Sequence, residues 1–169
     1  LKYLPEVAVI NNVEFDHADI YPDLEAVRLA FRRFVNLVPR TGMLLLGSDS
    51  PHAAALQEFA VSPVQTFGLT DGAMWQAHDL QAADGVMRFR VRRHGEPFGE
   101  FESPLLGVHN VRNALAAIAV GSHVGLDVSQ LSGAMRSFKG IRRRQEVVGT
   151  SQGVTVIDDF AHHPTAVRE

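Results

Sequence analysis

Two apolar segments decide the fold of this sequence: Glu6-Val-Ala-Val-Ile-Asn11 and Gly42-Met-Leu-Leu-Leu-Gly47. Each is a short apolar run that ends in a polar residue or glycine, a pattern typical of buried strands. Between them, apolar residues recur at spacings of three and four over residues 24–38. This spacing predicts an amphipathic helix with Pro22 at its first turn and Pro39 as its stop. The order of strand, helix and strand predicts a parallel sheet with right-handed crossovers.

The rest of the chain predicts an antiparallel section, then helices, then a separate unit. Short alternating segments from Val64 to Glu102 are typical of antiparallel strands or hairpins. Helices are expected over residues 51–59, 109–124 and 128–138. Lys139-Gly140-Ile141 is interpreted as a hinge, after which two strands, 145–149 and 154–157, precede a helix that starts near Pro164.

The predicted fold class is therefore α/β, with a domain boundary near residue 140. The chain begins at Leu1 rather than at methionine, and it stops at Glu169, a few residues into the last expected helix. We therefore expect a piece of a longer protein.

The composition limits the classes of function. With 46% hydrophobic and 21% charged residues, the 169-residue chain can bury a sizeable core. A net charge of −3 gives no basic field for wrapping nucleic acid or for lying on an anionic membrane, so small molecules are the expected partners. The lack of cysteine excludes a disulfide framework and a thiolate metal cage, and it fits a reducing, cytoplasmic location.

The first of four polar clusters runs from Asn11 to Asp19 and follows the first predicted strand. It holds three carboxylates and His17. Ligands of open α/β folds bind beyond the carboxyl ends of parallel strands, and oxygen ligands with one imidazole suit Mg²⁺ facing phosphates. A polar loop with helix-capping acids explains the same residues at least as well.

The second and third clusters carry amides and guanidinium groups. Asn110 and Asn113 stand three residues apart at a helix start and share a face, where paired amides can bind a purine edge; capping by Asn110 is the alternative. Residues 142–144, three arginines, follow the hinge. Guanidinium groups bind phosphate bidentately, although a basic run is more often a solvated face.

The fourth cluster, Asp158 to Thr165, lies between a predicted strand and a predicted helix. Its carboxylates could bind ribose hydroxyls or a metal, and His162 and His163 could contact phosphate or act as bases. Each histidine could equally be a structural hydrogen-bonding residue.

In this order, the motifs N-x-E-x-D-H, G-x-H-N-x-x-N-A, R-R-x-E and D-D-F-A-H-H-P-T resemble those of the Mur ligase family. The similarity runs from Val7 to Glu169. It implies that residues 1–139 are the later part of a mostly parallel-sheet central ATPase domain with an antiparallel section. Residues 140–169 would be the hinge and the start of a Rossmann-like C-terminal domain. Within the family, the motifs are most similar to the murein peptide ligases, since the alanine ligases usually have Tyr where Phe160 stands.

The resemblance also implies ATP and Mg²⁺ as cofactors and a set of residues that bind them. His17 matches a ligand of the second magnesium ion. Asn110 and Asn113 match residues around adenine and the nucleotide, Arg143 matches a position against the base, and Asp159 matches the acid that binds the ribose.

Two residues match positions near the reacting phosphate and are the expected catalytic residues. Arg144 corresponds to the arginine that reaches the γ-phosphate, and His162 aligns with a position near the transferred phosphate. In the family, ATP phosphorylates the muramyl carboxylate, an amine attacks the acyl phosphate, and phosphate leaves. The implied substrates are UDP-N-acetylmuramate and the murein tripeptide L-alanyl-γ-D-glutamyl-meso-diaminopimelate, in peptidoglycan recycling.

Three alternatives stay open. A ligase of the same family could use L-alanine as its acceptor. A metal-dependent phosphohydrolase would need Asp16, His17, Asp159 and His162 to converge, and a pure binding module would need no chemistry at all. The family's G-x-G-K-[ST] phosphate loop does not occur in this sequence. By itself, the chain is therefore expected to be inactive.

Overall fold

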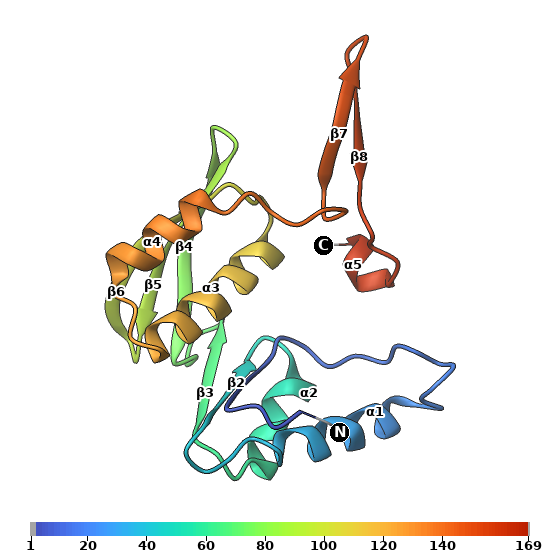
Figure 1. The fold of residues 1–169 in the computed structure, drawn as a ribbon, viewed down its shortest axis with the longest axis vertical. Helices are drawn as coiled ribbons and strands as arrows, with labels where there is room; N and C mark the ends of the chain where they lie inside the picture. Colours follow the sequence, from blue (N-terminus) through green and yellow to red (C-terminus); the bar gives the residue numbers. More distant parts are fainter. Residues whose placement is uncertain (1–2, 169) are drawn as a thin grey trace.

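In a computed structural model, residues 3–168 form a six-stranded mixed sheet with helices on both faces and a separate two-stranded ribbon (Figure 1). The strands of the sheet lie in sequence order, from β1 to β6. They are β1 (Val7–Ile10), β2 (Met43–Gly47), β3 (Val64–Gly68), β4 (Trp75–Ala83), β5 (Val86–Arg93) and β6 (Glu96–Ser103). Neighbours pair in parallel from β1 to β4 and antiparallel from β4 to β6. The predicted α/β class is confirmed.

One expected pairing direction is wrong. The alternation after Val64 predicted antiparallel strands, but β3 runs parallel to β2 and to the start of β4, where Phe67 pairs with Trp75. Alternation reports that one face of a strand is buried, and it carries no information about direction. Here the helical segment between β2 and β3 crosses back over the sheet, so β3 enters it in the same direction as β2.

All five residues of strand β2 are buried, so the sheet is covered on both faces at this strand. Met43 and Leu45 belong to a hydrophobic cluster with α3 (Val108–His123) and the antiparallel strands. Leu44 and Leu46 belong to another cluster, with α1 (Leu24–Val35). Successive side chains of a strand point to opposite faces, so one apolar run contributes to both layers.

The helices begin where side chains cap them. Asp23 is the N-cap of α1 and accepts a hydrogen bond from the amide of Ala26. Pro22 therefore lies outside the helix, and its expected place in the first turn is wrong. The helix expected over residues 51–59 is split into α2 (Pro51–Ala54) and the 3₁₀ helix η1 (Ala55–Phe59).

After α4 (Val128–Ser137), the chain up to residue 168 adds no further strand to the six-stranded sheet. Beyond it, β7 (Glu146–Ser151) and β8 (Val154–Asp158) form a hairpin that projects away from the rest of the molecule, followed by α5 (Pro164–Arg168) (Figure 1). Gly140, in the linker, has a φ of +83°. The domain boundary near residue 140 stays a prediction. Among residues 3–168, no helix is long and apolar enough to cross a membrane.

Candidate functional site

A cavity of about 1370 Å³ lies beyond the carboxyl ends of the parallel strands. Its wall is formed by the loop after β1, the end of β2, the start of α3, and residues from the C-terminal segment. Five of the seven predicted site residues line it: His17, Asn110, Asn113, Arg144 and Asp159. Arg143 and His162 are not among the lining residues. Segments far apart in the sequence thus meet where open α/β proteins bind ligands.

The first turn of α3 carries the two predicted amides. Gly107, with a φ of +97°, is the N-cap residue and supplies no side chain, so Asn110 is not the N-cap. The Asn110 amide instead donates to the carbonyl of Leu106, at 2.7 Å. The side-chain oxygen of Asn113 accepts a hydrogen bond from Nδ2 of Asn11, at 2.8 Å. This contact ties α3 to the loop after β1.

A carboxylate that the sequence interpretation missed sits at the end of β2. Asp49 accepts hydrogen bonds from the amides of Leu69 and Thr70 and from Nε of Arg112, the last at 2.8 Å. Burial raises the pKa of Asp49, but the hydrogen bonds from Arg112 and from the two amides outweigh it and lower the pKa overall. Gly68 leaves room for this carboxylate, because a Cβ there would lie 2.6 Å from its Oδ1. The available signal was an acid two residues beyond a buried strand.

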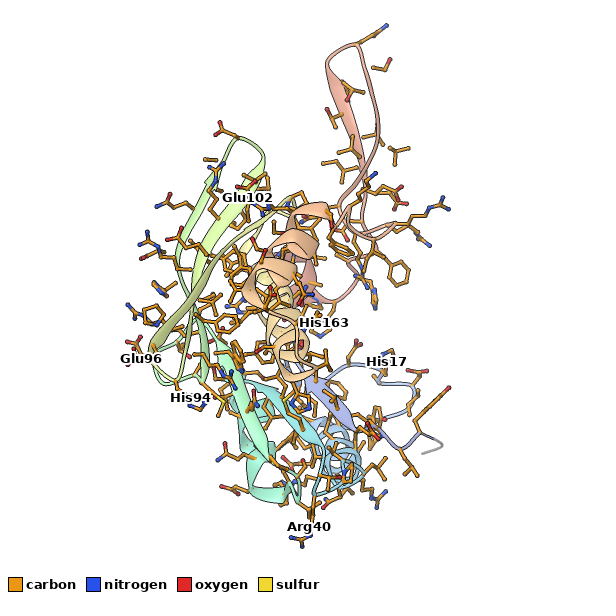
Figure 2. The ribbon with its side chains drawn as sticks, turned by 60° about the vertical axis from the view of Figure 1, so that its left-hand side comes forward. His17, Arg40, His94, Glu96, Glu102 and His163 are labelled. Atoms are coloured by element: carbon orange, nitrogen blue, oxygen red, sulfur yellow. The ribbon has the colours of Figure 1, made fainter. Side chains whose placement is uncertain are left out.

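The loop after β1 presents His17 and Asp16 to the cavity, and Figure 2 labels His17 on this loop. Nε2 of His17 lies 3.8 Å from Oδ2 of Asp16. A hydrogen bond from the His17 amide lowers the pKa of Asp16. A carboxylate and an imidazole side by side are suitable ligands for a divalent cation. Among residues 3–168, no group of three or more His, Cys, Asp or Glu side chains is arranged to hold a metal.

The two arginines after the hinge differ in their surroundings. Nε of Arg143 is 3.6 Å from Oδ2 of Asp158, and its guanidinium lies 4.9 Å from the centre of the Phe160 ring. These contacts hold Arg143 against the base of the hairpin. Arg144, with its guanidinium 5.9 Å from the same ring, lines the cavity. Of the two, Arg144 is therefore the better placed to meet a ligand there.

The segment after β8 carries the remaining predicted residues. Asp159 lines the cavity, and its Oδ1 accepts a hydrogen bond from the amide of Ala161 at 3.0 Å. His162 is exposed, its Nδ1 lies 2.9 Å from the carbonyl oxygen of Phe160, and its ring meets the Phe160 ring edge to face. The structure therefore places His162 against Phe160 and outside the cavity lining.

Comparison with known proteins identifies the family. A cavity at the carboxyl ends of parallel strands, beside the start of a helix, lies where α/β proteins of this class bind their ligands. The Mur ligase middle domain matches residues 2–121. The chain belongs to the Mur ligase family.

Three relatives show how close the similarity is. The chain is 38% identical to the UDP-N-acetylmuramate–L-alanine ligase of Desulfotalea psychrophila over 99% of its own length and 37% of the relative. It is 36% identical to the solved UDP-N-acetylmuramate:L-alanyl-γ-D-glutamyl-meso-diaminopimelate ligase from Neisseria meningitides, with a TM-score of 0.72 over 83% of this chain and 42% of that one. The UDP-N-acetylmuramate–alanine ligase of Thermotoga maritima gives 25% identity and a TM-score of 0.82 over 99% of this chain and 37% of that one. The chain thus spans little more than a third of these alanine ligases.

Proposed function

We propose that the chain is part of a cytoplasmic ATP-dependent ligase that joins L-alanyl-γ-D-glutamyl-meso-diaminopimelate to UDP-N-acetylmuramate in peptidoglycan recycling. Mur ligases are ATP-dependent amide-bond ligases, so family membership supports the reaction class. One observation carries the proposal: the amides of α3 and the charged groups of the C-terminal segment converge on a single cavity.

The lining groups have the chemistry that a nucleoside triphosphate requires. Asn110 and Asn113 offer donors and acceptors for a purine edge, and the Asp159 carboxylate can accept from ribose hydroxyls. Arg144 offers a bidentate guanidinium for phosphate. The cavity, at about 1370 Å³, is above the usual range of small-molecule sites, roughly 300–1000 Å³, so its size does not restrict the choice of a nucleotide as ligand.

His17 and Asp16 are the residues that would hold Mg²⁺. Magnesium usually takes one or two protein ligands and completes its shell with phosphate oxygens and water, so a pair of side chains fits this ion better than a site made only of protein groups. When bound, it would offset negative charge on the phosphates. Arg144, which lines the same cavity, would add positive charge.

The motif resemblance supports the tripeptide over L-alanine as the acceptor, because it implies Tyr in the alanine ligases where this chain has Phe160. The similar curated proteins are UDP-N-acetylmuramate–L-alanine ligases, whereas the similar solved structures include ligases of both kinds. The test is ADP release by the full-length protein with ATP, Mg²⁺ and UDP-N-acetylmuramate, comparing the tripeptide with free L-alanine. Preference for the tripeptide is the expected result. Preference for L-alanine would overturn the proposed acceptor and would make the chain part of an alanine ligase.

The phosphohydrolase alternative finds less support in the geometry. It needs Asp16, His17, Asp159 and His162 around a metal, yet His162 is outside the cavity lining and residues 3–168 contain no preformed group of three metal-ligating side chains. A binding module without chemistry would release no ADP in the same experiment.

A further inference from the structure

Side chains of the C-terminal segment are tied directly to the loop after β1. Oγ1 of Thr165 donates a hydrogen bond to Oε2 of Glu14 at 2.6 Å, and Nε2 of His163 lies 3.2 Å from the carbonyl oxygen of Phe15. Nδ1 of His163 lies 3.5 Å from the same Glu14 oxygen. These contacts join residues about 150 positions apart, and Figure 2 labels His163.

The partners of His163 fit one arrangement of its ring proton. The amide of Thr165 donates to Nδ1 of His163, at 3.3 Å, so Nδ1 acts as an acceptor. The proton of a neutral ring is then on Nε2, which donates to the Phe15 carbonyl. The ring therefore locks the start of α5 to the loop, and the Thr165 hydroxyl is free to donate to Glu14.

The hydrogen bond from the Thr165 hydroxyl to the Glu14 carboxylate is charge-assisted. A hydroxyl that donates to a carboxylate typically does so at about 2.5–2.7 Å, and such a bond is about twice as strong as one between neutral groups. Both side chains are partly buried, so water competes for them only in part.

The same segment carries groups that line the cavity. Asp159 and Ala161 lie a few residues before Thr165, and the amide of Phe160 donates to the carbonyl of Arg143, next to Arg144. Holding Thr165 against Glu14 therefore holds Asp159 and Arg144 in the wall of the cavity that α3 also lines. Gly140, whose φ is +83°, lies in the linker that would absorb any opening.

We propose that Glu14, His163 and Thr165 form a latch that holds the C-terminal segment closed over the cavity, and that Glu14 and Thr165 are positioning residues for the nucleotide. This inference rests on the proposed function. Apparent affinity falls with the fraction of molecules in the binding-competent state, so loss of the latch weakens nucleotide binding even though neither residue reacts.

The test uses the full-length protein with Thr165→Val, which removes the hydroxyl at nearly constant shape, and Thr165→Ser, which keeps it. Thr165→Val is expected to raise the KM for ATP about ten-fold and to change kcat less, whereas Thr165→Ser stays close to wild type. Glu14→Ala also removes the contacts of Glu14 with His163 and Asn12, so it gives at least as large a rise. The double variant Glu14→Ala/Thr165→Val shows no loss beyond that of Glu14→Ala, because the Thr165 bond is already absent in the single variant.

A second measurement needs no turnover. Hydrogen exchange of peptides covering residues 11–17 and 159–166 is expected to rise in both peptides for Thr165→Val and in neither for Thr165→Ser. Unchanged exchange in Thr165→Val, or additive effects of the two substitutions on KM, would overturn the latch. If the wild-type protein releases no ADP with UDP-N-acetylmuramate, the proposed function fails, and the exchange measurement still decides the latch.

Discussion

Arg112 on α3 donates a hydrogen bond from Nε to Oδ2 of Asp49, at the end of β2, over 2.8 Å. The Asp49 side chain is 15% exposed and the Arg112 side chain is 34% exposed, so the carboxylate of the pair is largely shielded from solvent. Asp49 also binds the amides that follow β3. A single carboxylate thereby fixes the relative positions of two strand ends and of the helix that carries Asn110 and Asn113.

Replacing Arg112 with Met should lower the free energy of unfolding by about 1–3 kcal/mol, because the aliphatic stem is kept while a hydrogen bond to a charged acceptor is lost. Urea denaturation measures the loss, and Arg33→Met, on the exposed side of α1, is the matched control. A double-mutant cycle with Asp49→Asn isolates this pair from the other contacts of Arg112. A coupling free energy near zero would show that the pair contributes nothing.

The lowered pKa of Asp49 makes its contribution depend on pH. A folded pKa below the unfolded value, which is about 3.9, gives stability that is fully present above that value. This stability is lost as the pH falls through the folded pKa. The difference in unfolding free energy between wild type and Asp49→Asn should therefore be largest near neutral pH and should shrink at the acid end. A constant difference from pH 7 to pH 3 would contradict this assignment.

Two glycines should respond in opposite ways to the same substitution. A Cβ on Gly47 would overlap the carbonyl oxygen of Asn11, so Gly47→Ala must displace the backbone after β1 and should cost about 1–3 kcal/mol. Gly133, inside α4, has nothing within 4 Å of the added carbon, and Gly133→Ala should stabilise the protein by about 0.5–1 kcal/mol through higher helix propensity. Thermal or urea unfolding of the two variants, side by side, provides the measurement.

His17→Ala should raise the Mg²⁺ concentration that gives half-maximal ADP release and leave most of the rate at saturating Mg²⁺. The reason is that the imidazole is one ligand among several, the rest being phosphate oxygens and water. His123→Ala, at the exposed end of α3, is the control. Complete loss of activity at every Mg²⁺ concentration would instead favour the phosphohydrolase alternative.

Much of the fold could be predicted from local patterns. The strand β2 and the inward-facing residues of α3 follow from apolar periodicity, and Val111, Leu115 and Ile118 are indeed buried. The hairpin turn at Gln152-Gly153 follows from turn chemistry, since both residues have positive φ. These features depend on contacts between near neighbours in the sequence, which is why they are visible there.

The candidate site could be predicted only in part. The motifs located the polar segments, and the structure brings His17, Asn113 and Asp159 to one cavity. Composition alone shows Arg143 and Arg144 only as members of a basic run, and their different roles were expected from the family resemblance. In the structure they face different surroundings, because Asp158 and Phe160 hold Arg143 while Arg144 lines the cavity. The different environments of these two arginines depend on the conformation of the irregular segment after the hinge, and no periodic pattern in the sequence predicts that conformation.

The sequence by itself determined the class of the fold, the order of its elements and the polar segments that could form a site. The spacing of apolar residues repeats over a few residues in helices and strands, so it can be recognised directly in the sequence. Only the tertiary structure decided the direction of β3 and the pairing of Asp49 with Arg112 and of Glu14 with Thr165. These pairs lie 63 and 151 positions apart and are set by crossovers that bring distant segments together, so no local pattern specifies them.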